Sequence, residues 1–148
     1  MKRADKLIGP DLGAGADRYV STAKTRTILA AGARFRAERA GADDMLSVGD
    51  AAMLACAEVV TMRTWISQGR VIALKRPRNS YRLPRWQFEP ALWDAIPQLG
   101  NALGTTDGWV MLAFLEAPAG MLAGRTPRLA IEQGDIDLVL KAALADSF

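Results

Sequence analysis

Apolar positions recur with helical spacing over most of this 148-residue chain, and two short strand-like runs interrupt them near the middle. An Ala- and Arg-rich segment from Thr22 to about Arg39 predicts a first helix with few large apolar groups to anchor it. Residues 1–22 carry Gly, Pro and mixed charges without an apolar period, which predicts a flexible arm. Four arginines of the predicted helix are expected to face solvent: Arg26, Arg34, Arg36 and Arg39.

A capping-box sequence marks the start of the next helix. Ser47 and Asp50 stand three residues apart, so the hydroxyl and the carboxylate can satisfy free N–H groups of the first turn. This helix is expected to run to about Cys56, and a turn follows at 54–58 without the glycine that is usual there. Cys56 is expected to serve as a small buried apolar group.

A second short helix is predicted from about Glu58 to Gln68, with Gly69 as the residue that ends it. Three of its apolar residues, with Trp65 beside them, are expected to face inward: Val59, Met62 and Ile66. Five polar residues occupy the rest of its surface and should face solvent: Thr61, Arg63, Thr64, Ser67 and Gln68.

Two strand-like runs follow at 71–75 and 80–83, and the residues Pro-Arg-Asn between them have the composition of a turn. Helix, turn, helix and basic hairpin in this order predict a winged helix-turn-helix. After Pro90 the pattern is helical to the end of the chain. The expected fold class is therefore mainly α: a helix-turn-helix with a small β-hairpin wing, followed by a small C-terminal helical bundle.

Capping residues divide the C-terminal part into helices. Asp107 can cap the helix that follows it, and Thr126 can cap a helix that has Pro127 at its first position and ends at Gly134. Asp135 is expected to cap the last helix, whose apolar stripe is Ile136, Val139, Leu140, Ala143 and Leu144.

The composition limits the kinds of catalytic, disulfide and metal sites that the chain can form. The chain has one cysteine and no histidine, which excludes an internal disulfide and removes Ser-His-Asp and Cys-His catalysis. A structural zinc site is disfavoured for the same reason. We therefore expect no enzyme activity, no metal and no cofactor, and a cytoplasmic protein, because a single cysteine fits a reducing compartment. No apolar run is long enough to cross a bilayer, so no membrane partner is expected.

Charge is divided unevenly along the chain. Residues 1–90 contain 16 Lys and Arg against 9 Asp and Glu, whereas residues 91–148 contain 3 against 7. This asymmetry indicates attraction of the first part to a polyanion and a different partner for the second part. A solvated basic surface without any ligand gives the same count, and the count alone does not separate the two interpretations.

DNA is the polyanion that a helix-turn-helix predicts, since one helix reads base edges in the major groove while cations hold phosphates. The five polar residues of the second helix are the candidates for base edges and nearby phosphates, because Arg can pair with guanine and Gln with adenine. Phosphate contacts around the helix end and the wing are expected from Arg70, Lys75, Arg76, Arg78 and Arg82.

The C-terminal part contains the run Leu-Ala-Gly-Arg-Thr-Pro at 122–127, preceded by Trp109 and the pair Phe114-Leu115 and followed by Gly134. This arrangement resembles the toxin-binding domain of the Xre/MbcA/ParS-like antitoxins of bacterial toxin–antitoxin pairs. The resemblance implies a helical bundle that dimerises and covers a toxin, often a RES-domain enzyme that consumes NAD. Exposed residues near the last two helices are then expected to contact the toxin: Arg125, Arg128, Glu132, Asp135, Asp137 and Phe148.

The stretch 46–90 resembles the MerR/excisionase-like helix-turn-helix found upstream of such domains. We therefore expect a DNA-binding region at 23–90 and a toxin-binding and dimerisation domain at 91–148. Together they predict a homodimeric antitoxin that neutralises a toxin and represses its own operon. Two alternatives stay open: a stand-alone transcriptional regulator or excisionase-like DNA-binding protein, and an interaction protein whose helix-turn-helix binds no DNA.

Overall fold

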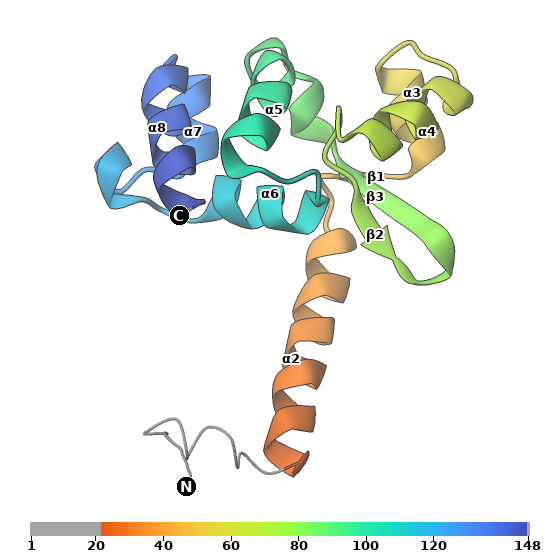
Figure 1. Cartoon of the computed structure of the whole chain (residues 1–148). Helices are drawn as coiled ribbons and strands as arrows, with labels where there is room; N and C mark the ends of the chain where they lie inside the picture. The colour runs from red at the N-terminus through yellow and green to blue at the C-terminus, as the bar shows by residue number, and fades with distance from the viewer. Residues whose placement is uncertain (1–21, 148) are drawn as a thin grey trace, which may run out of the picture. The chain divides into compact units, whose positions relative to one another are not determined.

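The computed structural model describes residues 22–147, so nearly all of the expected N-terminal arm lies outside the described residues. The chain divides into two compact units, Met1–Arg39 and Ala40–Phe148. Helix α2 (Thr22–Ala40) forms where the Ala- and Arg-rich segment predicts it, and its residues up to Arg39 make up the described part of the first unit (Figure 1). Three of its four arginines are exposed and Arg39 is half-buried, and its large apolar side chains are exposed as well: Ile28, Leu29 and Phe35.

Within residues 22–147, no helix has both the length and the apolar character that a membrane-spanning segment needs. In the same part of the chain, no three Cys, Asp or Glu side chains converge in the way that metal ligands would.

The second unit is mainly helical and contains one small sheet (Figure 1). Its first part consists of β1 (Met45–Leu46), α3 (Val48–Leu54), α4 (Val59–Gln68), β2 (Leu74–Arg76), the 3-10 turn η1 (Pro77–Asn79) and β3 (Ser80–Pro84). Its second part consists of the 3-10 turn η2 (Arg85–Phe88), α5 (Pro90–Leu103), α6 (Gly108–Glu116), the 3-10 turn η3 (Gly120–Leu122), α7 (Pro127–Glu132) and α8 (Ile136–Asp146). This order confirms the predicted fold class.

The three strands form an antiparallel sheet in the order β1-β3-β2, so the last strand lies in the middle. Successive side chains of a strand point to opposite faces. Leu83 of β3 belongs to a small apolar cluster with Ala52 of α3 and Met62 of α4. Leu74 of β2 belongs instead to a larger cluster with α5 to α8. The hairpin therefore contributes to both clusters and joins the helix-turn-helix to the C-terminal helices.

The first strand of the hairpin is shorter than the apolar run at 71–75 predicts. Ile72 is fully buried, but strand pairing begins only at Leu74. The reason is a side chain, because Gln87 bonds to both backbone polar groups of Ile72 and replaces a neighbouring strand there.

Three predicted N-caps are confirmed. The side chains of Ser47, Asp107 and Thr126 each accept a hydrogen bond from a backbone N–H in the first turn of the helix that follows. The fourth predicted N-cap, Asp135, does precede α8. The prediction that its side chain caps the helix is wrong, because this side chain makes no capping hydrogen bond. Its carboxylate lies 2.7 Å from Arg125 Nη1 and is used in that ion pair instead.

The apolar stripe of α8 differs from the predicted one at its end. Val139 and Ala143 are fully buried as expected, whereas Leu144 is 49% exposed. Ala142, outside the predicted stripe, is buried. The face of α8 that packs on the core is therefore rotated toward Ala142, which turns Leu144 to solvent.

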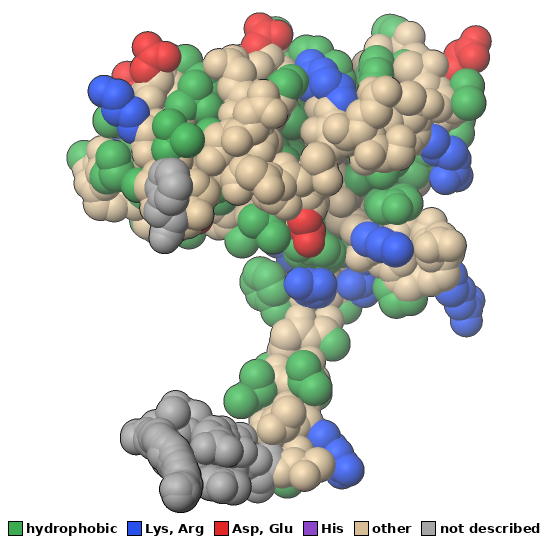
Figure 2. All heavy atoms as spheres, in the orientation of Figure 1, with side chains coloured by type: hydrophobic (Ala, Val, Ile, Leu, Met, Phe, Trp, Pro, Cys, Tyr) green, Lys and Arg blue, Asp and Glu red, His purple; other side chains and the backbone are tan. Residues whose placement is uncertain are grey.

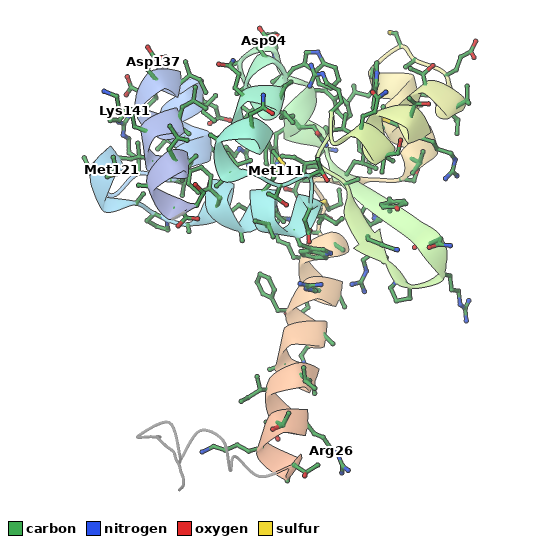
Figure 3. The ribbon with its side chains drawn as sticks, viewed as in Figure 1. Arg26, Asp94, Met111, Met121, Asp137 and Lys141 are labelled. Atoms are coloured by element: carbon green, nitrogen blue, oxygen red, sulfur yellow. The ribbon has the colours of Figure 1, made fainter. Side chains whose placement is uncertain are left out.

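The larger apolar cluster runs across the expected boundary at residue 90. It contains Ile72 and Trp86 from before this point and Leu92 and Ile96 of α5 from after it. Met111 of α6 is also buried in it (Figure 3). Packing therefore does not separate 23–90 from 91–148, and the division between them stays a prediction about function.

Candidate nucleic-acid interface

The turn between α3 and α4 uses Cys56 where a glycine is usual. Cys56 has a φ of 54°, in the left-handed region that favours glycine. The next residue, Ala57, donates its backbone N–H to Ala52 O at 2.9 Å and closes the turn. Cys56 is exposed, so the expectation of a buried apolar group is wrong. Its position at the tip of the turn explains both observations.

The exposed face of α4 carries most of the predicted polar residues. Four of the five are exposed, namely Arg63, Thr64, Ser67 and Gln68, and Thr61 is half-buried. The Thr64 hydroxyl donates to Val60 O at 3.1 Å and the Ser67 hydroxyl to Thr64 O at 2.8 Å. Because their protons point to the helix, both hydroxyl oxygens present lone pairs that can accept hydrogen bonds.

The inward face of α4 is only partly as predicted. Met62 is fully buried and Ile66 half-buried, whereas Val59 is 45% exposed. The small apolar cluster reaches α4 from Met62 onward, so the first turn of the helix extends beyond it. An apolar patch is exposed at this end of the helix-turn-helix: Met53, Leu54, Val59 and Val60. Such side chains can contact thymine methyl groups in a major groove.

The hairpin places further cations beside the helix-turn-helix. Lys75 and Arg78 are exposed and Arg76 is half-buried. The predicted turn forms at η1, with both Arg78 and Asn79 at positive φ. Lys and Arg side chains lie along the hairpin in the space-filling view (Figure 2). We refer to these three cations, together with the exposed Arg63 of α4, as the α4–wing surface.

Arg82 is half-buried and is not counted in the α4–wing surface, and its contact with phosphate stays a prediction. Its Nε donates to Ala40 O at 3.2 Å and its Nη2 to Met45 O at 3.4 Å. The guanidinium thereby satisfies carbonyl groups at the start of the second unit. The sequence shows the charge of Arg82 and its position on a strand. Neither property shows which backbone carbonyl groups lie within reach of its guanidinium.

Arg70 follows the end of α4 and stacks on an aromatic ring of α5, a contact that the sequence did not predict. Its guanidinium carbon lies 3.4 Å from the centre of the Trp93 ring, and the residue is half-buried. Burial lowers the pKa of Arg70, and the charge of Asp94 on α5 acts in the opposite direction. The cation therefore stacks on α5 and does not stand with the wing residues.

Most residues predicted to bind a partner make contacts within the second unit. Arg125 donates through Nε to Leu122 O at 2.9 Å and through Nη1 to Gln133 Oε1 at 2.8 Å, in addition to its pair with Asp135. It thereby ties the loop at 122–125 to the start of α8. Arg128 pairs with Glu132 one turn away at 3.3 Å, and its guanidinium lies 4.4 Å from the Trp86 ring centre. Of the other two, Asp137 is exposed on α8 (Figure 3) and Phe148 lies outside the described residues.

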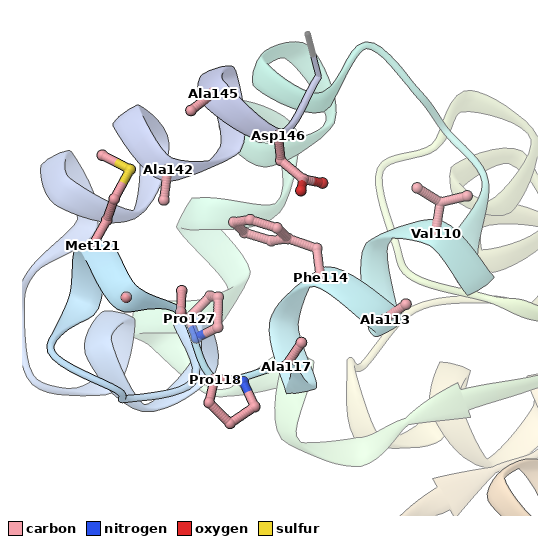
Figure 4. A pocket seen from close by; sticks show the side chains of 12 residues that line it. Val110, Ala113, Phe114, Ala117, Pro118, Met121, Pro127, Ala142, Ala145 and Asp146 are labelled. Atoms are coloured by element: carbon pink, nitrogen blue, oxygen red, sulfur yellow. The ribbon is translucent and has the colours of Figure 1, made fainter.

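An apolar groove that the sequence did not predict lies between α6, η3 and α8 (Figure 4). Its volume is about 580 Å³, and Phe114 points into it. Its rim includes the exposed side chains of Val110 and Met121, and Asp146 is the only charged residue in its lining. We call it the α6–α8 groove. The only signal for it in the sequence is the resemblance, since the helix with Phe114 and the loop before Pro127 supply much of its wall.

Comparison of the chain with models of protein families, with curated proteins and with solved structures found no match.

Proposed function

We propose that the protein is the antitoxin of a type II toxin–antitoxin pair. In this proposal, the α4–wing surface binds operator DNA and the C-terminal helices bind and neutralise the toxin. The observation that carries the proposal is the presence of two surfaces of different chemistry in one packed unit. One is a cationic helix-turn-helix with a wing, and the other is an apolar groove built from the segments that resemble the antitoxin family.

The α4–wing surface suits DNA because it combines a helix that can enter the major groove with cations beside it. Arg63 and Gln68 on α4 have side chains that can pair with guanine and adenine edges. Lys75, Arg76 and Arg78 supply cations for phosphate contacts beside α4, whereas the guanidinium of Arg82 is held by the carbonyl groups of Ala40 and Met45. A homodimer would match an operator with two half-sites, as is usual for this class of reader.

The α6–α8 groove suits a protein partner because exposed apolar surface in a concave site favours association. Residues 91–148 contain more acidic than basic groups, which favours a partner surface with basic groups around an apolar segment. The resemblance adds the identity of this partner as a toxin, with the RES type as the first candidate. Neutralisation would follow from covering the toxin, without any chemistry on the antitoxin.

The test uses the full-length protein, the product of the adjacent gene, and DNA from upstream of both genes. We expect a stable complex with the neighbouring protein in gel filtration. We also expect a mobility shift of the upstream fragment that a scrambled fragment of equal length does not give. A shift without a complex would favour the stand-alone regulator, and a complex without a shift would favour the interaction protein. If neither occurs, the proposal is wrong.

A further inference from the structure

A second concave site lies where α4 and α5 end, beside the loop that leads into α6. Its volume is about 590 Å³, and among the residues that line it Arg70 is the only charged one. The lining also contains three glycines and four uncharged polar residues: Gln68, Asn101, Thr105 and Thr106. We call it the Arg70 cavity. It contains no carboxylate in its lining, although Asp94 of α5 lies close enough to Arg70 to act on its charge.

The Arg70 guanidinium is fixed in place by aromatic packing. It stacks on Trp93, whose ring centre lies 5.3 Å from that of Trp65 and 5.7 Å from that of Phe88. Within residues 22–147, no group accepts a hydrogen bond from its Nη1, which is covered by protein atoms. Buried donors are almost always paired, and a charged donor without an acceptor costs more than a neutral one. The covered Nη1 of the Arg70 guanidinium therefore has no hydrogen-bond acceptor.

We propose that the Arg70 cavity binds a phosphate group. The planar guanidinium presents N–H donors in a fork that matches phosphate oxygens, and such charge-assisted bonds are among the strongest in proteins. Gly104 has open space where a side chain would lie, so an anion can approach the backbone there, whereas the Thr106 side chain fills this space beside Gly69. The polar side chains of Asn101 and Thr106 supply further donors at its wall.

A phosphate in this cavity would contact both halves of the second unit. Gln68 is the last residue of α4, and Asn101 lies in the last turn of α5. A bound anion would therefore join the end of the proposed reading helix to the first C-terminal helix. Two sources supply this chemistry, a free phosphate or phosphate monoester and the phosphodiester backbone of DNA. The site shares Gln68 with the proposed reading helix, but the binding of phosphate does not depend on the proposed function.

Titration of the full-length protein with inorganic phosphate, at ionic strength held constant with sodium chloride, tests the proposal directly. Trp93 lies against the guanidinium, so its fluorescence should change in a saturable way as phosphate binds. Arg70→Met keeps the packing on Trp93 and removes the charge, and we expect it to raise the half-saturating phosphate concentration by about tenfold or more. Lys141→Met removes an exposed cation of α8, outside the lining of the cavity, and should leave the titration unchanged. A non-saturable response, or an equal response of Arg70→Met, would overturn the proposal.

Asn101→Asp provides a second variant in case Arg70→Met does not fold, which circular dichroism would show. It adds a carboxylate at an exposed position of the cavity wall and should weaken phosphate binding without unfolding the protein. Unchanged binding in this variant would count against the cavity as the site.

A duplex of the upstream DNA then separates the two sources. If DNA displaces phosphate and Arg70→Met lowers the salt dependence of DNA binding, the phosphodiester backbone occupies the cavity. If DNA and phosphate bind without competition, the ligand is a free phosphate or a phosphate monoester. The phosphate titration needs neither DNA nor toxin, so its failure and the failure of the proposed function are distinguishable.

Discussion

The side-chain amide of Gln87 pairs with both backbone polar groups of Ile72. Gln87 Nε2 donates to Ile72 O at 2.8 Å, and Gln87 Oε1 accepts from Ile72 N at 2.7 Å. Gln87 is fully buried and is the only buried polar or charged residue found among residues 22–147. One side chain thus supplies the hydrogen bonds that a strand would supply, at the point where the helix-turn-helix passes into the hairpin.

Replacing Gln87 with Leu should therefore destabilise the protein. The change keeps an apolar side chain of similar size but leaves a buried N–H and a buried C=O of Ile72 without partners, which costs about 2–5 kcal/mol in total. Urea denaturation followed by circular dichroism measures the loss in the free energy of unfolding. Gln98→Leu is the matched control, because Gln98 is exposed on α5 and its loss should change stability by less than about 0.5 kcal/mol. Equal effects of the two variants would contradict this account.

Local signals in the sequence were sufficient for the helices and the hairpin, but not for β1 or for the start of β2. Ser47, Asp107 and Thr126 are short side chains that cap helices through bonds within three residues, so their role can be inferred from spacing alone. The order of helices and strands followed from periodicity and from Gly and Pro positions in the same way.

Long-range contacts of polar side chains leave no such local signal in the sequence. Arg82 bonds to Ala40 O across 42 positions, and Gln87 bonds to Ile72 across 15. Arg70 stacks on Trp93, which lies in a different helix. Each of these residues looks like a surface residue in a sequence pattern, because the pattern records polarity and not the position of a distant partner. The sequence therefore supplied the candidate residues of the site, but not the contacts that hold the side chains of Arg70 and Arg82.

The turn between α3 and α4 offers a stabilising substitution. Cys56 holds a left-handed conformation that costs a residue with a side chain about 1–2 kcal/mol. Glycine removes this strain but loses about 0.5–1 kcal/mol through the greater freedom of the unfolded chain. Cys56→Gly should therefore raise the free energy of unfolding modestly, by about 0.5–1 kcal/mol, as measured by thermal denaturation. Cys56→Val should lower it, since a β-branched residue tolerates positive φ poorly. A stabilising valine would show that φ at this position is not positive in solution.

Substitutions of Arg78 and Arg82, which both lie in the hairpin, should have different effects on DNA binding and on stability. Arg78→Ala removes an exposed wing cation and should reduce the slope of log affinity against log salt by about 1, because one phosphate contact is lost. Fluorescence anisotropy of the upstream duplex at several salt concentrations measures this slope. Arg82→Ala should instead lower the free energy of unfolding by about 1–2 kcal/mol, since two carbonyl groups lose a charged donor, and should leave the slope unchanged. The reverse pattern would place Arg82, and not Arg78, on the DNA.

Two matched variants, one at the rim of the α6–α8 groove and one outside it, test whether the protein partner binds in this groove. Met121 is 51% exposed at the rim of the groove, and Leu129 is 41% exposed on α7 outside its lining. Because both side chains are already in contact with water, Met121→Glu and Leu129→Glu should each change stability little. A carboxylate at Met121 would have to lose water when an apolar segment fills the groove, and burial of an unpaired charge is strongly unfavourable. We therefore expect Met121→Glu to weaken the complex with the adjacent gene product by tenfold or more, roughly 1.4 kcal/mol, in isothermal titration calorimetry. Leu129→Glu should bind as the unmodified protein does. DNA affinity should be unaffected in both variants, because neither residue lies on the α4–wing surface. Loss of binding in Leu129→Glu alone would show that the partner binds at α7 and not at the groove.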